Sequence, residues 1–155
     1  MAQSKKGIVV SQQKYTLDLL AETSLIAYKP ADTLIDLNHY FIADVGDKLI
    51  NVGRYQRLVG RLIYFTITRP NITYAVSVVS QFMYALTIVH LDAVNRILRY
   101  LKNSPSVGLL YSPQFDLCIK GYTDAYWIGS VTDRCSTSCY CTFIGGNLVT
   151  WRSKK

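Results

Sequence analysis

The sequence lacks any uninterrupted run of the ~20 apolar residues that a membrane-spanning helix needs. Arg54, Arg57, Arg61 and Arg69 interrupt the most apolar region of the chain. Residues 1–6 include Lys5 and Lys6, but the apolar run that follows them is too short for a secretory signal. We therefore expect a soluble intracellular protein, cytoplasmic or nuclear, with no membrane partner.

The chain is also poor in the residue patterns that build common catalytic and metal sites. Its cysteines form no C-x-x-C pair, and His39 and His90 lie far from them in the sequence, which disfavours zinc against small apolar strand residues. Disulfides are disfavoured in an intracellular chain. There is no glycine-rich phosphate loop, and residues 136–138 (Ser-Thr-Ser) have no nearby histidine to activate a hydroxyl. The cysteines are Cys118, Cys135, Cys139 and Cys141.

Charged residues make up only 17% of the sequence and hydrophobic residues 50%, a composition that folds. The 155 residues suffice for one domain or for two incomplete lobes. The net charge is +7, which favours contact with a polyanion because neutralised phosphates release their counterions. A basic surface that only keeps the chain in solution is the alternative.

Helical periodicity predicts a short amphipathic helix over 12–23, followed by an irregular connector over 24–51. The strongest pattern covers 53–66, where one face is apolar and another carries arginines. Two further helices are predicted, one starting at Pro70 and one over 90–102, and short joints favour their antiparallel packing. The apolar faces comprise Tyr15, Leu19, Leu20, Tyr55, Leu58, Val59, Leu62, Ile63, Thr66, Ile72, Ala75, Val76, Val79, Phe82, Leu91, Val94, Ile97, Leu98 and Leu101.

Beyond Gly108 the pattern changes from helical to alternating, which predicts strands over 109–111, 117–122, 140–144 and 148–151. Gly145 and Gly146, followed by Asn147, are typical of a hairpin turn between the last two. Near the N-terminus, residues 7–11 predict one edge of a hairpin whose partner is missing from the chain.

Several segments, in order and over almost the whole chain, resemble the Pol polyprotein of copia-type LTR retrotransposons at the junction between reverse transcriptase and ribonuclease H. The last of them places one carboxylate, Asp124, at the end of an alternating strand pattern. The segments are KGIVVSQ (6–12) with KY (14–15), KPADT (29–33), RYQRLVG (54–60), TRPNI (68–72), RILRYLK (96–102) and 121–155, which begins GYTDAYW and ends TWRSKK.

The resemblance implies an α+β fold, with a helical thumb-like bundle followed by the first antiparallel strands of an incomplete ribonuclease H-like fold. It assigns 1–107 to the C-terminal part of reverse transcriptase, with the end of the palm and thumb-like helices. It assigns 108–155 to the N-terminal part of a truncated ribonuclease H-like domain. The absence of a covering helix is expected to leave apolar strand positions exposed, and the chain to associate through that sheet surface.

The resemblance also implies which chemistry is incomplete. The family's polymerase aspartates lie upstream of the position of Met1, and the later ribonuclease H acids lie downstream of Lys155. Asp124 resembles the first-strand aspartate that binds Mg²⁺ in ribonuclease H, where paired ions hold the attacking and leaving oxygens. One acid holds Mg²⁺ weakly. A solvated strand-end aspartate is the alternative interpretation, and Asp133 is interpreted as a turn residue.

The sequence departs from the family's pattern at four positions. Tyr126 stands where the family has a second aspartate, and Asn71 replaces the aspartate after Thr-Arg-Pro. Cys135 and Cys139 replace a basic residue and a glycine, respectively. A glycine at the second position would permit backbone geometries that cysteine resists. These departures suggest drift in a copy that is no longer held to function.

Cations at helical spacing form the expected nucleic-acid surface, since thumb helices of reverse transcriptases lie along the primer–template backbone. An ordinary solvated helix face is the alternative. Tyr122, Tyr126 and Trp127 are candidates for base stacking, although core packing is favoured for them. The cations are Arg54, Arg57, Arg61, Arg96, Arg99 and Lys102.

The sequence therefore predicts a fragment of a retrotransposon polyprotein whose parent family is an RNA-directed DNA polymerase with ribonuclease H and Mg²⁺ as cofactor. The isolated fragment is expected to be no enzyme, to hold no stable cofactor, and to bind primer–template or RNA–DNA hybrid without sequence preference. The alternative hypothesis is a non-enzymatic interaction module or an inert pseudogene product.

Overall fold

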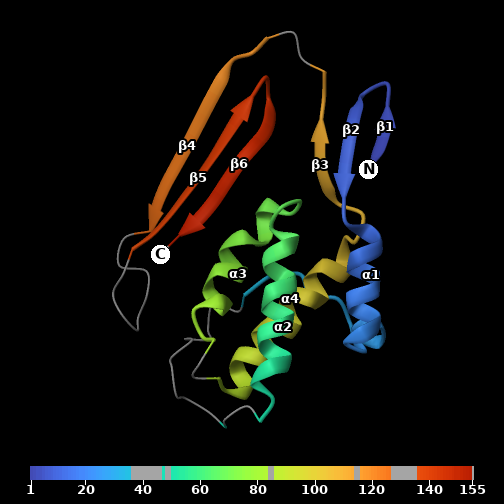
Figure 1. Cartoon of the computed structure of the whole chain (residues 1–155), viewed down its shortest axis with the longest axis vertical. Coiled ribbons are helices and arrows are strands. Elements are labelled where there is room, and N and C mark those ends of the chain that lie inside the picture. Colours follow the sequence, from blue (N-terminus) through green and yellow to red (C-terminus); the bar gives the residue numbers. More distant parts are fainter. Residues whose placement is uncertain (36–46, 48–49, 84–85, 114–115, 127–135, 155) are drawn as a thin grey trace.

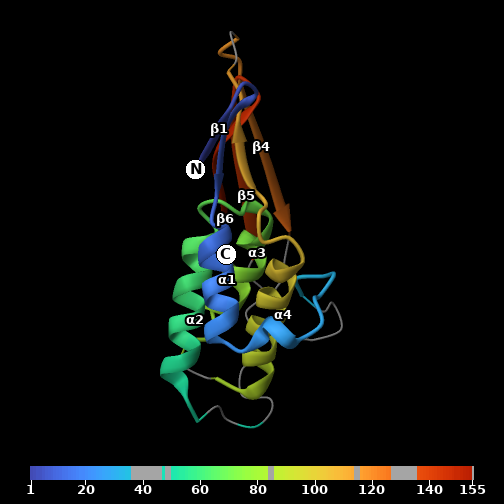
Figure 2. The ribbon, with the colours of Figure 1, turned by 90° about the vertical axis from the view of Figure 1, so that its right-hand side faces the viewer.

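A computed structural model describes residues 1–35, 47, 50–83, 86–113, 116–126 and 136–154. These residues form a mixed α and β structure with four α-helices and two three-stranded antiparallel sheets. The helices pack together at one end, and the two sheets extend from that bundle (Figure 1). Viewed from 90° away, both sheets lie in one thin layer above the helices (Figure 2).

The predicted helices are confirmed, with boundaries within a few residues of the sequence pattern. None of the helices in the described ranges is long and apolar enough to cross a membrane. A short 3₁₀ turn at Leu25–Ala27 follows the first helix, and a second one at Pro70–Ile72 directly precedes the third helix. The helices are α1 (Gln13–Glu22), α2 (Val52–Phe65), α3 (Thr73–Ser80) and α4 (Ile88–Asn103).

The core lies where the apolar faces of the four helices meet. α2 buries Tyr55, whose hydroxyl donates a hydrogen bond to the carbonyl oxygen of Val79 in α3 at 2.7 Å. Burial raises the pKa of this Tyr55 hydroxyl above its ordinary value. The prediction for Ile63 was wrong, because Ile63 is 47% exposed and Phe65 is buried instead. Both residues lie at the edges of the α2 apolar stripe, where periodicity alone does not decide burial.

The first sheet joins the two ends of the helical region in the order β1-β2-β3. Its strands are β1 (Ala2–Ser4), β2 (Gly7–Ser11) and β3 (Gly108–Tyr111). The prediction that β2 lacks a partner in this chain was wrong, because β2 pairs with both β1 and β3. Close approach requires glycine at Gly108, where an added Cβ would lie 2.1 Å from the carbonyl oxygen of Val10.

The second sheet is formed by β4 (Ile119–Tyr126), β5 (Thr137–Ile144) and β6 (Asn147–Lys154) in sequence order. Gly145 and Gly146 have φ values of 54° and 76°, which suit the two-residue turn between β5 and β6. The expected exposure of apolar strand positions is confirmed, since Ile119 is 69% exposed and Tyr140 is 45% exposed. The strand predicted over 109–111 is β3, which pairs with β2 in the first sheet and is not part of the second sheet.

Among the described residues, two sets of hydrogen bonds attach the second sheet to the rest of the molecule. The indole Nε1–H of Trp151 in β6 donates to the carbonyl oxygen of Thr66, at the end of α2, at 2.8 Å. The Asn147 side chain exchanges two hydrogen bonds with the backbone of Ser112, at 2.8 and 2.9 Å. The sheet is therefore attached at the first residue of β6 and near the middle of that strand.

A buried histidine stabilises the start of α4. The backbone N–H of Thr87 donates to Nδ1 of His90 at 3.1 Å, which forms one half of a capping box. The His90 ring stacks on Phe82 with ring centroids 4.4 Å apart. Burial lowers the pKa of His90 below its ordinary value of 6.5, because a charged imidazole would lose its hydration.

We expect the free energy of unfolding to fall as the pH is lowered through about 6.5. The unfolded chain binds the proton at a higher pH than the folded chain, so this part of the stability is fully present above 6.5 and decreases toward the folded-state pKa. Urea unfolding at about pH 7.5 and about pH 5 would measure it. His90→Gln keeps a side-chain acceptor at the cap without titrating, and an equally steep pH dependence in that variant would contradict the assignment.

Candidate functional site

The candidate cations on α4 bind the segment that follows α1. Arg96 donates to the hydroxyl of Thr33 at 2.6 Å, and Arg99 donates to the carbonyl oxygen of Lys29 at 2.7 Å. Lys102 donates to the carbonyl oxygen of Tyr28 at 2.7 Å. Charge-assisted hydrogen bonds of this kind stabilise the packing of an irregular segment. These three side chains therefore hold residues 26–33 against α4.

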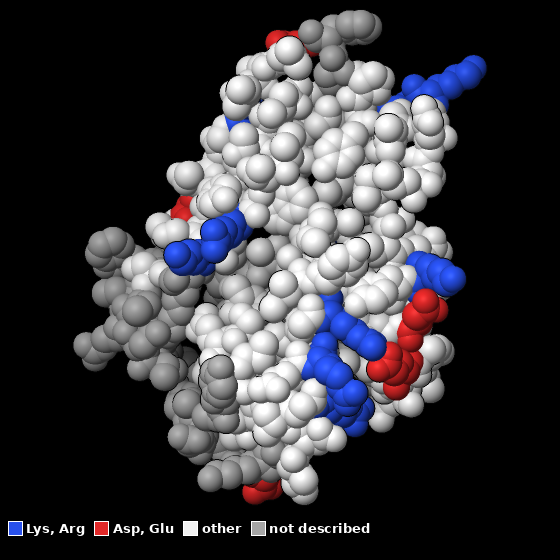
Figure 3. Space-filling view, in the orientation of Figure 1, with Lys and Arg blue, Asp and Glu red and all other residues white. Residues whose placement is uncertain are grey.

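The candidate cations on α2 have a different environment. Arg54 and Arg57 are exposed and make no ion pair with any described residue. Arg61 forms an ion pair with Glu22 of α1. In Figure 3 the blue side chains over α2 lie beside red side chains over α1. The free cationic surface of this helix is therefore concentrated on its first two turns.

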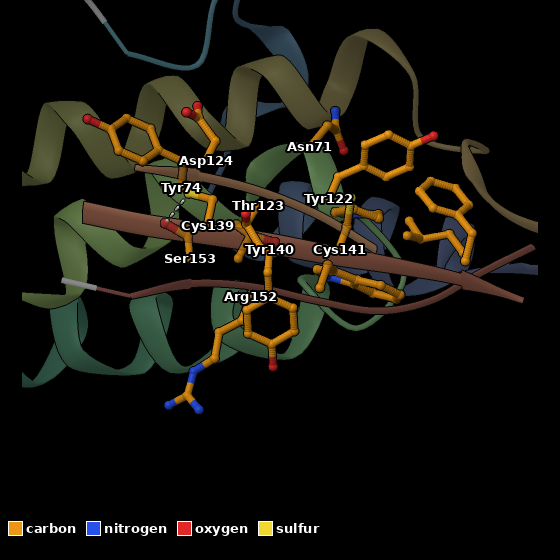
Figure 4. Close-up of a pocket in the computed structure, with 15 residues that line it drawn as sticks. Asn71, Tyr74, Tyr122, Thr123, Asp124, Cys139, Tyr140, Cys141, Arg152 and Ser153 are labelled. Atoms are coloured by element: carbon orange, nitrogen blue, oxygen red, sulfur yellow. Dashed lines mark hydrogen bonds between the residues drawn. The ribbon is translucent and has the colours of Figure 1, made fainter. Parts of the chain in front are cut away.

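Asp124 lies in a cleft of about 410 Å³ between the start of α3 and one face of the second sheet. Asp124 in β4 is the cross-strand partner of Cys139 in β5, which is in turn the partner of Ser153 in β6. Directly opposed residues share one face of a sheet, so these three side chains line the same wall. Figure 4 shows the Asp124 carboxylate and the Tyr74 ring projecting in the same direction, while Arg152 projects the opposite way.

The side chains that line the cleft with Asp124 include aromatic, amide, hydroxyl and thiol groups, and no other carboxylate among the described residues. The cleft is lined by Asn71 and Tyr74 from the helical side, and the Cys139 thiol donates to the Ser153 hydroxyl at 3.3 Å. Mg²⁺ takes hard oxygen ligands, and two-metal sites need several carboxylates. In the described parts of the chain, no group of three His, Cys, Asp or Glu side chains can hold a metal ion. The described lining of this cleft does not fit a Mg²⁺ pair.

Of the other residues singled out in the sequence, some lie in the described ranges and others do not. Tyr122 is 58% exposed and packs edge-on against Phe143, with ring centroids 5.9 Å apart. Asn71 donates from its amide to the hydroxyl of Tyr100 at 3.1 Å, so it contributes to the contact between the 3₁₀ turn and α4. Trp127, Asp133, Cys135 and the side chain of Tyr126 lie outside what the structure describes.

One buried cation was missed by sequence reasoning. Arg69 is 2% exposed and donates from Nη1 to the carbonyl oxygens of Ser104 and Val107, at 2.6 and 3.0 Å. Its Nη2 donates to the Ser104 hydroxyl at 3.0 Å. Burial lowers the pKa of the guanidinium from its ordinary value, although an arginine remains charged near neutral pH. The only sequence signal was its position in the Thr-Arg-Pro segment of the resemblance.

Comparison with known proteins gives consistent matches along nearly the whole chain. The retrovirus-related Pol polyprotein from transposon RE1 of Arabidopsis thaliana is 40% identical over 149 residues, which are 96% of this chain and 10% of the polyprotein. The polyprotein from transposon RE2 of the same plant is 37% identical over 150 residues, 97% of this chain and 10% of the polyprotein. An uncharacterized mitochondrial protein of Arabidopsis thaliana is 33% identical over 149 residues, 96% of this chain and 62% of that protein.

These matches define the chain as related to retrovirus-like transposon proteins, and the sequence resemblance is confirmed. The chain belongs to the Pol polyproteins of copia-type retrotransposons. It spans about one tenth of the length of the first two relatives. No protein-family model matches the chain, and no solved structure matches it significantly.

Proposed function

We propose that this chain is the part of a copia-type Pol polyprotein that leads from the thumb-like helices of reverse transcriptase into the first strands of ribonuclease H, and that it holds nucleic acid by its backbone. The helical region supplies the contact surface, and the second sheet carries the first ribonuclease H-like strands. The family membership supports this placement within the polyprotein, and the net charge of +7 supports a polyanionic partner.

The observation that carries the proposal is the pair of exposed arginines at the start of α2. Arg54 and Arg57 lie one helical turn apart and are not neutralised by a described acid. Cations on one helix face follow phosphates without contacting base edges, so binding is independent of sequence. The α4 cations donate hydrogen bonds to residues 26–33 and therefore contribute less to this surface.

We propose binding without cleavage for the isolated chain. Asp124 lines the cleft together with Tyr74, Asn71 and the Cys139 thiol, and these side chains are poor partners for the metal-assisted hydrolysis of a phosphodiester. Asp124 is then a polar group in a cleft whose other described lining residues include no second carboxylate.

The double charge reversal Arg54→Glu with Arg57→Glu is expected to weaken binding to an RNA–DNA hybrid about tenfold or more at low salt. Two lost phosphate contacts are also expected to reduce the slope of log affinity against log salt by about 2. Fluorescence anisotropy titrations at several salt concentrations would measure both quantities. The matched control is Lys5→Glu with Lys6→Glu, which changes the net charge equally at exposed positions between β1 and β2.

Equal weakening by both double variants would show that only overall charge matters and would contradict a surface on α2. Undetectable binding of the unaltered chain at low salt would contradict the proposed function itself. That second result would favour the non-enzymatic interaction module.

A further inference from the structure

The third arginine of α2 is held by an acid of α1. Arg54, Arg57 and Arg61 lie three and four residues apart, a spacing that places them on one face of the helix. Within the described residues, Arg61 is the one of these three that forms an ion pair, and its partner is the Glu22 carboxylate. Figure 3 shows acidic side chains of α1 on the same side of the molecule as the basic side chains of α2. The row of free cations therefore ends at a contact within the chain.

The presence of Glu22 is not explained by the helix that carries it. Glu22 is the last residue of α1, where unpaired carbonyl oxygens make a carboxylate unfavourable. The last turn of α1 contains no basic residue that would offset this charge. The side chain is 61% exposed, so apolar packing does not account for it either. The contact that favours a glutamate here is the one with Arg61, which lies 39 residues further along the chain.

The ion pair leaves the Arg61 guanidinium accessible to a competing anion. The Arg61 side chain is 35% exposed, and an exposed ion pair is weak because water screens both charges. A phosphodiester offers oxygen acceptors to a guanidinium in the same way as a carboxylate does. Glu22 therefore occupies donors of Arg61 that a phosphate group of nucleic acid would otherwise bind.

We propose that Glu22 limits nucleic-acid binding by competing with phosphate groups for Arg61. This inference rests on the function proposed above and concerns the regulation of the same surface. With the ion pair formed, the free cations of α2 extend from Arg54 to Arg57, about 4.5 Å along the helix axis. With Arg61 released they extend over about 10.5 Å and contact one more phosphate. The contact between α1 and α2 is thus autoinhibitory, because it holds the affinity for a polyanion below the value that the sequence of α2 allows.

The variant Glu22→Gln tests the proposal in fluorescence anisotropy titrations of an RNA–DNA hybrid at several salt concentrations. Glutamine keeps the length of the side chain but carries no charge that competes for the guanidinium. The variant is expected to bind the hybrid about threefold more tightly at low salt. The slope of log affinity against log salt is expected to steepen by about 1, because one more phosphate is neutralised. Circular dichroism would establish that each variant is folded.

Two further variants separate the release of Arg61 from a general change in charge. Asp18→Asn raises the net charge by the same amount, at an exposed position one turn earlier on α1 that forms no ion pair with Arg61. It is expected to leave the salt slope unchanged. Glu22→Gln combined with Arg61→Gln replaces the ion pair by two uncharged side chains at constant net charge. This double variant is expected to bind the hybrid like the unaltered chain.

Three results would overturn this inference and leave the proposed function intact. Equal gains in Glu22→Gln and Asp18→Asn would show that only the overall charge matters. A gain that persists in the double variant would show that the effect does not pass through Arg61. A double variant that binds more weakly than the unaltered chain would show that Arg61 already contacts phosphate beside Glu22. Undetectable binding by every variant at low salt would instead contradict the proposed function, and this inference with it.

Discussion

Replacing Arg69 with methionine is expected to lower the free energy of unfolding by about 3 kcal/mol. The guanidinium donates to three acceptors in the segment that follows α4, and two of these acceptors are backbone carbonyls. Methionine fills a similar volume but donates no hydrogen bond, so the carbonyl oxygens of Ser104 and Val107 lose their charged donor. Equilibrium urea unfolding would measure the loss.

Two controls separate the hydrogen bonds from the general effect of removing an arginine. Arg69→Lys keeps the charge but not the planar fork of donors. Its free energy of unfolding is expected to lie between those of the unaltered chain and of the methionine variant. Arg57→Met removes an exposed arginine and is expected to change stability by no more than about 0.5 kcal/mol. Removing a buried charge also removes its desolvation cost. A methionine variant as stable as the unaltered chain would show that this cost cancels the hydrogen bonds and would contradict the prediction.

Replacing Trp151 with alanine is expected to detach the second sheet from the helices, at a cost of about 2 to 3 kcal/mol. The variant loses both the indole packing in the cleft and the hydrogen bond to Thr66. Because the other described hydrogen bonds from this sheet to the rest of the molecule are those of Asn147, its opening becomes easier than that of the helical core. Hydrogen exchange would show faster exchange of the amides of β5 and β6 than of those of α4.

Trp151→Phe is the matched control for this second result. Phenylalanine keeps a ring in the cleft and removes only the Nε1–H donor, so about 1 kcal/mol of the loss is expected from this change. Equal acceleration in α4 and in the sheet would mean that the two regions unfold as one unit. That outcome would contradict the role of Trp151 as a local attachment.

The elements with strong local periodicity could be predicted from sequence. The apolar stripe of α2 repeats with helical spacing, and the buried positions Tyr55, Leu58, Val59 and Leu62 follow from it. The pair Gly145-Gly146 predicted a hairpin turn, because both residues need positive φ values that other residues rarely adopt. In both cases the residues that determine the structure are neighbours in the sequence.

The features that depend on distant partners could not be predicted. Helical spacing placed Arg96, Arg99 and Lys102 on α4, but it gave no information about the carbonyl groups of residues 26–33 that they meet. The sequence could not distinguish Arg69 from an exposed arginine, because the acceptors of its guanidinium lie near Ser104, far along the chain. The environment of Asp124 likewise depends on Tyr74 and Asn71, which are far away in the sequence.

The pairing of β2 with β3 has a consequence for how the chain reaches its structure. Ser11 is the partner of Gly108, so the two strands meet only after α1, α2, α3 and α4 have been synthesised between them. Closing such a long loop costs entropy before the strand hydrogen bonds form, and non-local pairing slows folding. On the ribosome, β2 therefore emerges before β3 and can pair only with β1 at first, while the helices can already collapse around their shared core.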